Sequence, residues 1–289
     1  MRYTSGKEFL DDPRKCVALL GLSGVGKTTA CRSLPSSQWF HYSVDYRIWT
    51  RYLGDQLNDY LKSLALEQPV LRELLLKDAI TIEHRVHFDN LFATSVFMGM
   101  LGNPEKCGST GAAFRERMAE HARAEITAML DVSQFQARAE GLYNYPHFVI
   151  DTSGSLCEVI ESDDPDDAIL QLLDERCLVL YIEASEEHTD ELLRRNTSDP
   201  KPIYYRPDFI DAELPGLLAE FGAKNVEQLD PCEVSRYLYP RVLRHRVPRY
   251  EQIADKVGYT IGMSELLDGL HTKPLTEVVA ELIDRQQQA

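Results

Sequence analysis

The 289-residue sequence lacks long apolar runs, and it has few basic residues for its acidic content. No stretch approaches the roughly 18 apolar residues that a membrane-spanning helix needs, so we expect no membrane segment. Residues 1–10 are polar and lack the apolar core of a secretion signal. With 31 basic against 46 acidic residues, the net charge of −15 argues against general binding to nucleic acid or to anionic membranes.

Paired cysteine motifs are also missing. The six cysteines form no C-x-x-C pair, and at least Cys16 and Cys177 lie in apparent strands. This usage is typical of reduced, mostly buried thiols, and it predicts a cytoplasmic protein. No internal repeat and no linker rich in Pro, Gly or Ser separates two cores, so we expect one domain over residues 1–289.

Short apolar runs alternate with segments of helical periodicity. The strand-like runs are 16–20, 39–44, 147–150, 178–182 and 257–261. This alternation predicts an α/β fold: a parallel five-stranded sheet of the P-loop kinase type, with helices on both faces. We expect a helical insertion at residues 52–107, and a lid with a smaller insertion at residues 194–231.

Two segments show the helical period clearly. In 274–285, Pro274 is expected at the first helical position. In 112–131, apolar residues fall on one expected face. They are Phe114, Met118, Ala122, Ile126, Met129 and Leu130.

The stretch CVALLGLSGVGKTTA contains G-x-x-x-x-G-K-[ST] without a mismatch, between a strand and a helix start. Glycines let backbone N–H groups turn inward around phosphates, and the helix start adds partial positive charge. Lys27 is expected to reach the β- and γ-phosphates and Thr28 to ligate Mg²⁺, so ATP and Mg²⁺ are the expected cofactors. The candidate nucleotide ligands are Gly21, Ser23, Gly24, Val25, Gly26, Lys27, Thr28 and Thr29.

Two acids follow apolar strands. Asp151 ends the strand at 147–150 and could hold Mg²⁺, although such residues are often turn formers. Asp45 follows the strand at 39–44 and could take the proton of an acceptor hydroxyl. The alternative for Asp45 is an N-cap of a helix that begins near Tyr46.

Arginines cluster in two places. Arg194, Arg195 and Arg206 surround a Pro-rich polar loop, where a closing segment could neutralise charge on a transferred phosphate. Of five arginines in 241–250, Arg246 is the candidate for an anion pocket. Solvated surface positions are the alternative for each.

Four separated blocks, GLSGVGKTT, WFHYSVDYRIWTRYLG, VIDTSGS and RRNTSDPKPIYYRPDF, together with RVPRYEQIADKVGYTI, resemble the shikimate kinase group of small-molecule P-loop kinases. GAAFRERMAEHARAEI is a weaker match. The chain departs from that group at Ser43, where the group has an acid, at Ser153-Gly154-Ser155, where it has three glycines, and in its greater length.

The resemblance implies that Asp45 is the catalytic carboxylate beside the acceptor hydroxyl. It also implies that Arg115, Gly154 and Arg246 bind the substrate, that Arg206 is the lid arginine, and that Arg195 contacts the nucleotide. We therefore expect an ATP:Mg²⁺ phosphotransferase acting on a hydroxyl of a small anionic metabolite. The alternatives are an NTP-driven switch whose insertion contacts a protein partner, and a kinase of nucleotides or nucleotide-sugars; oligomeric state stays open.

Overall fold

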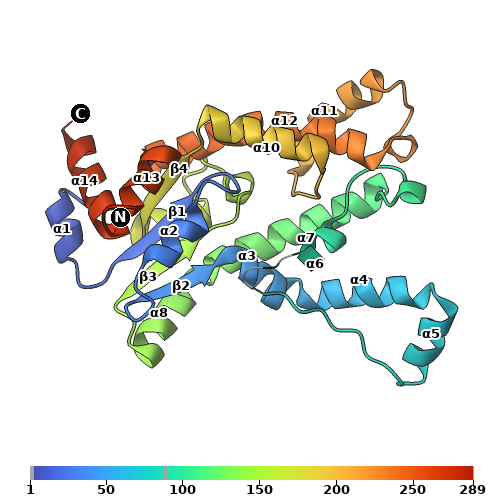
Figure 1. Cartoon of the computed structure of the whole chain (residues 1–289), viewed down its shortest axis with the longest axis horizontal. Helices are drawn as coiled ribbons and strands as arrows, with labels where there is room; N and C mark the ends of the chain where they lie inside the picture. Colours follow the sequence, from blue (N-terminus) through green and yellow to red (C-terminus); the bar gives the residue numbers. More distant parts are fainter. Residues whose placement is uncertain (1–2, 88–89, 91, 289) are drawn as a thin grey trace. The chain divides into compact units, whose positions relative to one another are not determined.

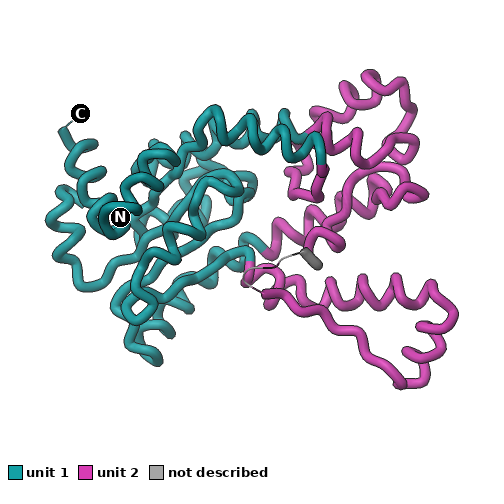
Figure 2. Tube along the Cα trace, in the orientation of Figure 1, with its two compact units in different colours: residues 1–45, 125–198, 239–289 teal, residues 46–124, 199–238 magenta. Residues whose placement is uncertain are grey.

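The computed structural model describes residues 3–87, 90 and 92–288. The chain groups into two compact units (Figure 2). Unit 1 contains Met1–Asp45, Glu125–Ser198 and Tyr239–Ala289, and unit 2 contains Tyr46–Ala124 and Asp199–Leu238. The predicted insertions at 52–107 and 194–231 lie largely in unit 2, and the single domain stays a prediction.

Unit 1 contains a five-stranded parallel sheet in the order β2-β3-β1-β4-β5, so the predicted α/β class and parallel sheet are confirmed (Figure 1). The strands are β1 Cys16–Leu20, β2 Trp39–Ser43, β3 His147–Asp151, β4 Leu178–Glu183 and β5 Gly258–Gly262. Central β1 is buried along its whole length, as its apolar sequence requires for a strand covered on both faces.

Four strands differ by one residue from the sequence expectation. Strands β3, β4 and β5 extend one residue beyond the expected end. Val44, predicted to end the second strand, instead begins a helix, and Val257 belongs to the helix that precedes β5. The helices that lie wholly in unit 1 are α1 Gly6–Asp11, α2 Lys27–Ser33, α8 Val132–Tyr143, α9 Ala168–Arg176, α10 Glu186–Ser198, α13 Met263–Leu270 and α14 Leu275–Gln287, with the 3₁₀ turn η3 Leu156–Glu158.

Helices cover both faces of the sheet at β2. His41 lies near Cys31 of α2. The next residue, Tyr42, donates a hydrogen bond to the carbonyl of Ala128 over 2.7 Å and packs against Phe135 of α8. Because successive side chains of a strand point to opposite faces, α2 and α8 cover opposite sides of the sheet.

Three helices cross a unit boundary: α3 Val44–Arg47, α7 Gly111–Leu130 and α12 Pro231–Val257. The predicted apolar face of α7 is wrong in part. Leu130 is 42 % exposed, whereas the polar residues His121 and Glu125 are buried. Pro274 is also corrected, because it is the N-cap of α14 and Leu275 is the first helical residue.

Unit 2 is mainly helical. Its elements are α4 Gly54–Leu66, α5 Pro69–Leu76, α6 Phe92–Met98 and α11 Pro207–Glu220, with η1 Ile48–Tyr52, η2 Pro104–Lys106 and η4 Val226–Gln228. The predicted helical insertion is interrupted, since residues 80–86 form no helix. Helix α5 buries none of its residues. In the described ranges, no helix combines the length and apolarity needed to cross a membrane.

Candidate functional site

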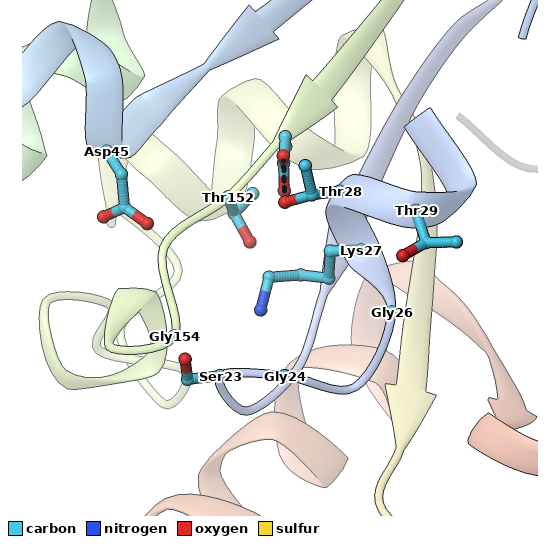
Figure 3. A pocket seen from close by; sticks show the side chains of 10 residues that line it. Ser23, Gly24, Gly26, Lys27, Thr28, Thr29, Asp45, Thr152 and Gly154 are labelled. Atoms are coloured by element: carbon cyan, nitrogen blue, oxygen red, sulfur yellow. Dashed lines mark hydrogen bonds between the residues drawn. The ribbon is translucent and has the colours of Figure 1, made fainter. Parts of the chain in front are cut away.

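The predicted phosphate loop links β1 to α2 (Figure 3). Gly21, Gly24 and Gly26 have φ angles of 140°, 83° and 98°, in the region that favours glycine. A Cβ on Gly21 would lie 2.6 Å from the carbonyl oxygen of Ile182 on β4. The glycines are therefore required both by the backbone turn and by its close approach to the neighbouring strand.

Lys27 folds back onto this loop. Its Nζ donates hydrogen bonds to the carbonyl oxygens of Gly21, at 2.7 Å, and Leu22, at 2.9 Å. The side chain is buried, and this burial lowers the pKa of Lys27, with the charges of Asp151 and Asp45 opposing the effect. The ammonium group thus faces two carboxylates.

Thr28 is the second residue of α2 and lies beside the end of β3. Its hydroxyl donates a hydrogen bond to Oδ2 of Asp151 over 2.7 Å. Asp151 is only 5 % exposed, and register places it opposite Leu19 of β1. This pair offers a hydroxyl and a carboxylate, the oxygen ligands that suit Mg²⁺.

A cavity of about 180 Å³ lies in front of the loop. Figure 3 shows the side chains of Asp45 and Lys27 pointing into this space from opposite sides. The lining residues are Ser23, Gly24, Gly26, Lys27, Thr28, Thr29, Asp45, Asp151, Thr152 and Gly154. All ten belong to unit 1, and nine of them come from predicted site residues; Thr152 is the addition.

Asp45 is half-buried in α3, directly after β2. Burial raises the pKa of Asp45 to about 6, with the Lys27 charge opposing and the Asp151 charge adding to the increase. The carboxylate lies within the helix and not ahead of it, so the N-cap alternative is wrong. A carboxylate with this pKa is suited to accept a proton near neutral pH.

Sequence reasoning missed a buried carboxyl group behind the cavity. Glu125 of α7 is fully buried and bonds with the hydroxyls of Ser153 and Ser155, the latter at 3.1 Å. Burial raises the pKa of Glu125 to about 7, and the Asp45 charge adds to this effect, while the serine hydrogen bonds and Arg246 oppose it. Ser153 and Ser155, which stand where the shikimate kinase group has glycines, thus donate hydrogen bonds to the buried carboxyl group of Glu125.

Arg246 is buried on α12 and is not among the residues that line the cavity. Its Nε donates to Oε1 of Glu158 at 2.9 Å, and its Nη1 donates to the carbonyl of Gly154 at 3.2 Å. Arg246 therefore supports the 153–155 loop directly, and its role as a substrate ligand stays a prediction. Tyr250, also of α12, is fully buried and stacks on Tyr181.

The other four predicted arginines each have a carboxylate partner within their own unit. Arg194 is exposed on α10 and pairs with Glu191 at 2.7 Å. In unit 1, Arg195 is exposed on α10 and pairs with Glu191. In unit 2, Arg115 pairs with Asp211 at 2.5 Å. Arg206, also in unit 2, precedes α11 and pairs with Asp208 through Nε at 2.8 Å. Their roles toward substrate and nucleotide stay predictions.

The residues present fit a magnesium nucleoside triphosphate. The glycine turn lines a cavity of about 180 Å³, Lys27 provides a cation, and Thr28 with Asp151 provides oxygen ligands. Comparison with known proteins adds no assignment: no family model, no curated protein and no solved structure matches this chain.

Proposed function

We propose that this chain is an ATP-dependent phosphotransferase that moves the γ-phosphate to a hydroxyl group of a small, anionic metabolite. One observation carries the proposal: Asp45 lines the same cavity as Lys27 and the Thr28–Asp151 pair. A phosphate-binding loop alone suits many functions. A carboxylate across from that loop is what removal of a proton from an acceptor hydroxyl requires.

Each group has a defined task in this proposal. Lys27 neutralises charge on the β- and γ-phosphates, and Thr28 with Asp151 holds Mg²⁺. The magnesium ion, when bound, neutralises phosphate charge that would otherwise repel the attacking oxygen. Asp45 orients the acceptor hydroxyl and accepts its proton, for which a pKa of about 6 leaves it mostly ionised at neutral pH.

The anionic character of the acceptor rests on the resemblance-derived arginines. Arg115 and Arg206 now hold carboxylates in ion pairs whose acid partners are well exposed. Exposed ion pairs contribute about 0–1 kcal/mol, so exchange of Asp211 or Asp208 for a substrate anion costs little. Gly154 of the 153–155 loop lines the cavity and would contact the acceptor there.

The test is a panel of hydroxyl-bearing acids, sugar acids and nucleosides, incubated with the full chain, ATP and Mg²⁺. Phosphorylated product is detected by ³¹P NMR alongside ADP release. Asp45→Asn should lower transfer to the productive acceptor at least about a hundredfold, whereas Asp166→Asn, which alters an exposed carboxylate of unit 1, should not. ADP release without any phosphorylated acceptor across the panel would contradict the proposal.

A second candidate, an NTP-driven switch with a protein partner, is favoured by α5. This helix exposes Val70 and Leu76 at 70 % each, together with Leu71. If ATP turnover stays slow with every small acceptor but rises with a protein partner, the switch replaces the kinase. For a nucleotide kinase we would expect aromatic cavity walls, and none of the ten lining residues is aromatic.

A further inference from the structure

Three side chains with metal-binding atoms meet beneath α2. The Sγ of Cys31, a ring nitrogen of His41 and a carboxylate oxygen of Asp151 all lie within 4.8 Å of one another. Within the described part of the chain, this is the one group of three His, Cys, Asp or Glu residues so closely spaced. The group was not anticipated from sequence, because its members are spread over three separate elements.

The fold explains why they meet. In the parallel pairing of β2 with β3, His41 lies opposite Val149 and Ser43 opposite Asp151. Because alternate residues share a face, His41 and Asp151 lie on the same side of the sheet, the side that α2 covers. Cys31 follows Thr28 by three positions in α2, which places both on one face of that helix.

We propose that Cys31, His41 and Asp151 form a binding site for a zinc ion. One sulfur, one nitrogen and one oxygen ligand make a donor set typical of Zn²⁺, whereas Mg²⁺ selects oxygen ligands alone. Around a tetrahedral zinc ion, neighbouring ligand atoms are about 3.5 Å apart, from bond lengths of about 2.0–2.3 Å. The Nε2 of His41 and Oδ2 of Asp151 are already 3.3 Å apart.

Burial and charge agree with such a site. Cys31 is 3 % exposed and Asp151 is 5 % exposed, so bound zinc would be shielded from water on those sides. The His41 side chain is 22 % exposed and leaves a path for the ion. A thiolate and a carboxylate together neutralise the double charge of Zn²⁺. This neutralisation lowers the free-energy cost of burying the ion.

The site shares Asp151 with the proposed magnesium site. Oδ2 accepts the Thr28 hydroxyl at 2.7 Å and is the oxygen nearest His41. A zinc ion on Oδ2 would therefore compete with the Thr28 hydrogen bond and disturb the magnesium ligands. The consequence, which rests on the proposed function, is that zinc weakens magnesium-dependent nucleotide binding and acts as an inhibitor.

The first experiment measures metal binding alone. The chelator-treated full chain is titrated with Zn²⁺ against a chromophoric chelator, and with Co²⁺ to detect the sulfur-to-cobalt charge-transfer band. Wild type should bind one ion and show the band. Cys31→Ser should lose the band and at least about a hundredfold in affinity, and His41→Gln should lose at least about tenfold.

Cys107→Ser is the matched control, because Cys107 is an exposed thiol outside the cluster. This variant should bind zinc like wild type. Thermal unfolding and far-UV circular dichroism verify that each variant is folded, and half-buried His41 gives a second variant should the buried Cys31 substitution fail to fold. Equal zinc affinity in wild type and His41→Gln, or a cobalt–thiolate band retained in folded Cys31→Ser, overturns the site.

The second experiment measures binding of a fluorescent, non-hydrolysable ATP analogue with Mg²⁺ in excess. Zinc at the saturating concentration found in the first experiment should weaken binding to wild type at least about fivefold, and leave Cys31→Ser unaffected. Equal effects in both proteins overturn the inhibitory role. Because no transfer is measured, a chain that phosphorylates no acceptor would contradict the proposed function and leave these zinc results standing.

Discussion

The Thr28 hydroxyl donates a hydrogen bond to Oδ2 of Asp151 over 2.7 Å, although 123 positions separate the two residues in sequence. Parallel pairing of β1 with β3 brings the end of β3 beside the loop that follows β1. In parallel sheets, ligands bind at the carboxyl ends of the strands. This single contact therefore ties the predicted phosphate loop to the strand that carries the second proposed magnesium ligand.

Removing this contact should impair magnesium use. Thr28→Val keeps the shape of the side chain and loses the hydroxyl, so we expect the Mg²⁺ concentration for half-maximal turnover to rise at least about tenfold. Thr28→Ser keeps the hydroxyl and should stay within about twofold of wild type. Magnesium titrations of ADP release measure both, and equal magnesium requirements in the two variants would contradict the assignment.

Lys27→Met should abolish transfer and weaken ATP binding at least about tenfold, because it removes the cation beside the phosphates. The same substitution should also lower stability. Lys27 is buried, and its loss leaves the carbonyls of Gly21 and Leu22 without their donor.

We therefore expect the free energy of unfolding of Lys27→Met to fall by about 1–3 kcal/mol, as for other buried acceptors that lose a partner. Calorimetric ATP titration measures the first effect and urea unfolding the second. Unchanged ATP affinity in a folded Lys27→Met protein would remove the phosphate role of this lysine.

Asp45 should give the reaction its dependence on pH. Because burial raises its pKa to about 6, a base at this position is protonated and inactive in more acidic solution. We expect kcat/KM to rise about tenfold per pH unit below pH 6 and to level off above it. In Asp45→Asn, transfer should fall at least about a hundredfold, and the rise of kcat/KM between acidic pH and pH 6 (the acidic limb) should vanish. ATP affinity should stay nearly unchanged.

The matched control for Asp45 is again Asp166→Asn, which should keep both the rate and the acidic limb. A wild-type profile flat from pH 5 to 8, or an Asp45→Asn variant with full activity toward the true acceptor, would show that Asp45 is not the base.

The strands and the phosphate loop were predictable because their signals are local. A run such as Cys16–Leu20 is apolar at every position and short, which favours a strand covered on both sides, and the loop motif fixes its own backbone through glycine. The face of α7 was not predictable in the same way. Glu125 is buried because Ser153 and Ser155 bond to it, and those partners lie 28 and 30 residues away.

A spacing signal for Glu125 did exist. Phe114, Met118, His121, Glu125 and Ala128 follow one another at intervals of four and three residues, and all are buried. The pattern of apolar residues alone predicts a face that includes Ala122 and Ile126, and it omits His121 and Glu125. Polar residues on a buried stripe are rare, and where they occur they need internal partners that a single segment cannot reveal.

The grouping into two units was hidden for a related reason. Residues 45 and 46 lie inside α3, residues 124 and 125 inside α7, and residues 238 and 239 inside α12, so three of the boundaries fall within continuous helices. Such boundaries leave no linker rich in Pro, Gly or Ser for composition to reveal. Unit 2 also draws on two separated stretches, 46–124 and 199–238, which sequence suggested only as two insertions.

Gly154→Ala should separate the 153–155 loop from the phosphate loop. A Cβ there would lie 2.8 Å from the backbone nitrogen of Ser23, which cannot move aside as a flexible side chain could. We expect ATP affinity to fall at least about fivefold and stability to fall by about 1–3 kcal/mol from the forced shift.

The control for Gly154→Ala is Gly141→Ala in α8, where an added Cβ meets nothing within 4 Å. Alanine there should stabilise the helix by up to about 1 kcal/mol and leave ATP affinity unchanged. Nucleotide titration and urea unfolding of both variants are the measurements. If Gly154→Ala binds ATP as tightly as Gly141→Ala, the 153–155 loop does not support the phosphate loop.

Glu125 should make stability fall as pH rises. Burial raises its pKa from 4.5 to about 7, so the folded chain holds a proton that the unfolded chain releases above about pH 4.5. The resulting stabilisation is complete below pH 4.5 and is lost as pH rises to 7. The difference between the folded and unfolded pKa corresponds to about 3 kcal/mol.

Glu125→Gln cannot lose this proton, so its free energy of unfolding relative to wild type should grow by about 3 kcal/mol between pH 4.5 and pH 8. The pKa of Asp45 is also raised, so Asp45 makes stability fall with pH in both proteins. This contribution cancels when the variant is compared with wild type. Urea unfolding across this range is the measurement, with Glu277→Gln at an exposed position of α14 as the control that should show no such growth. A constant difference between Glu125→Gln and wild type would mean that Glu125 is ionised in the folded protein throughout this range, held by Ser153, Ser155 and Arg246 more strongly than burial opposes it.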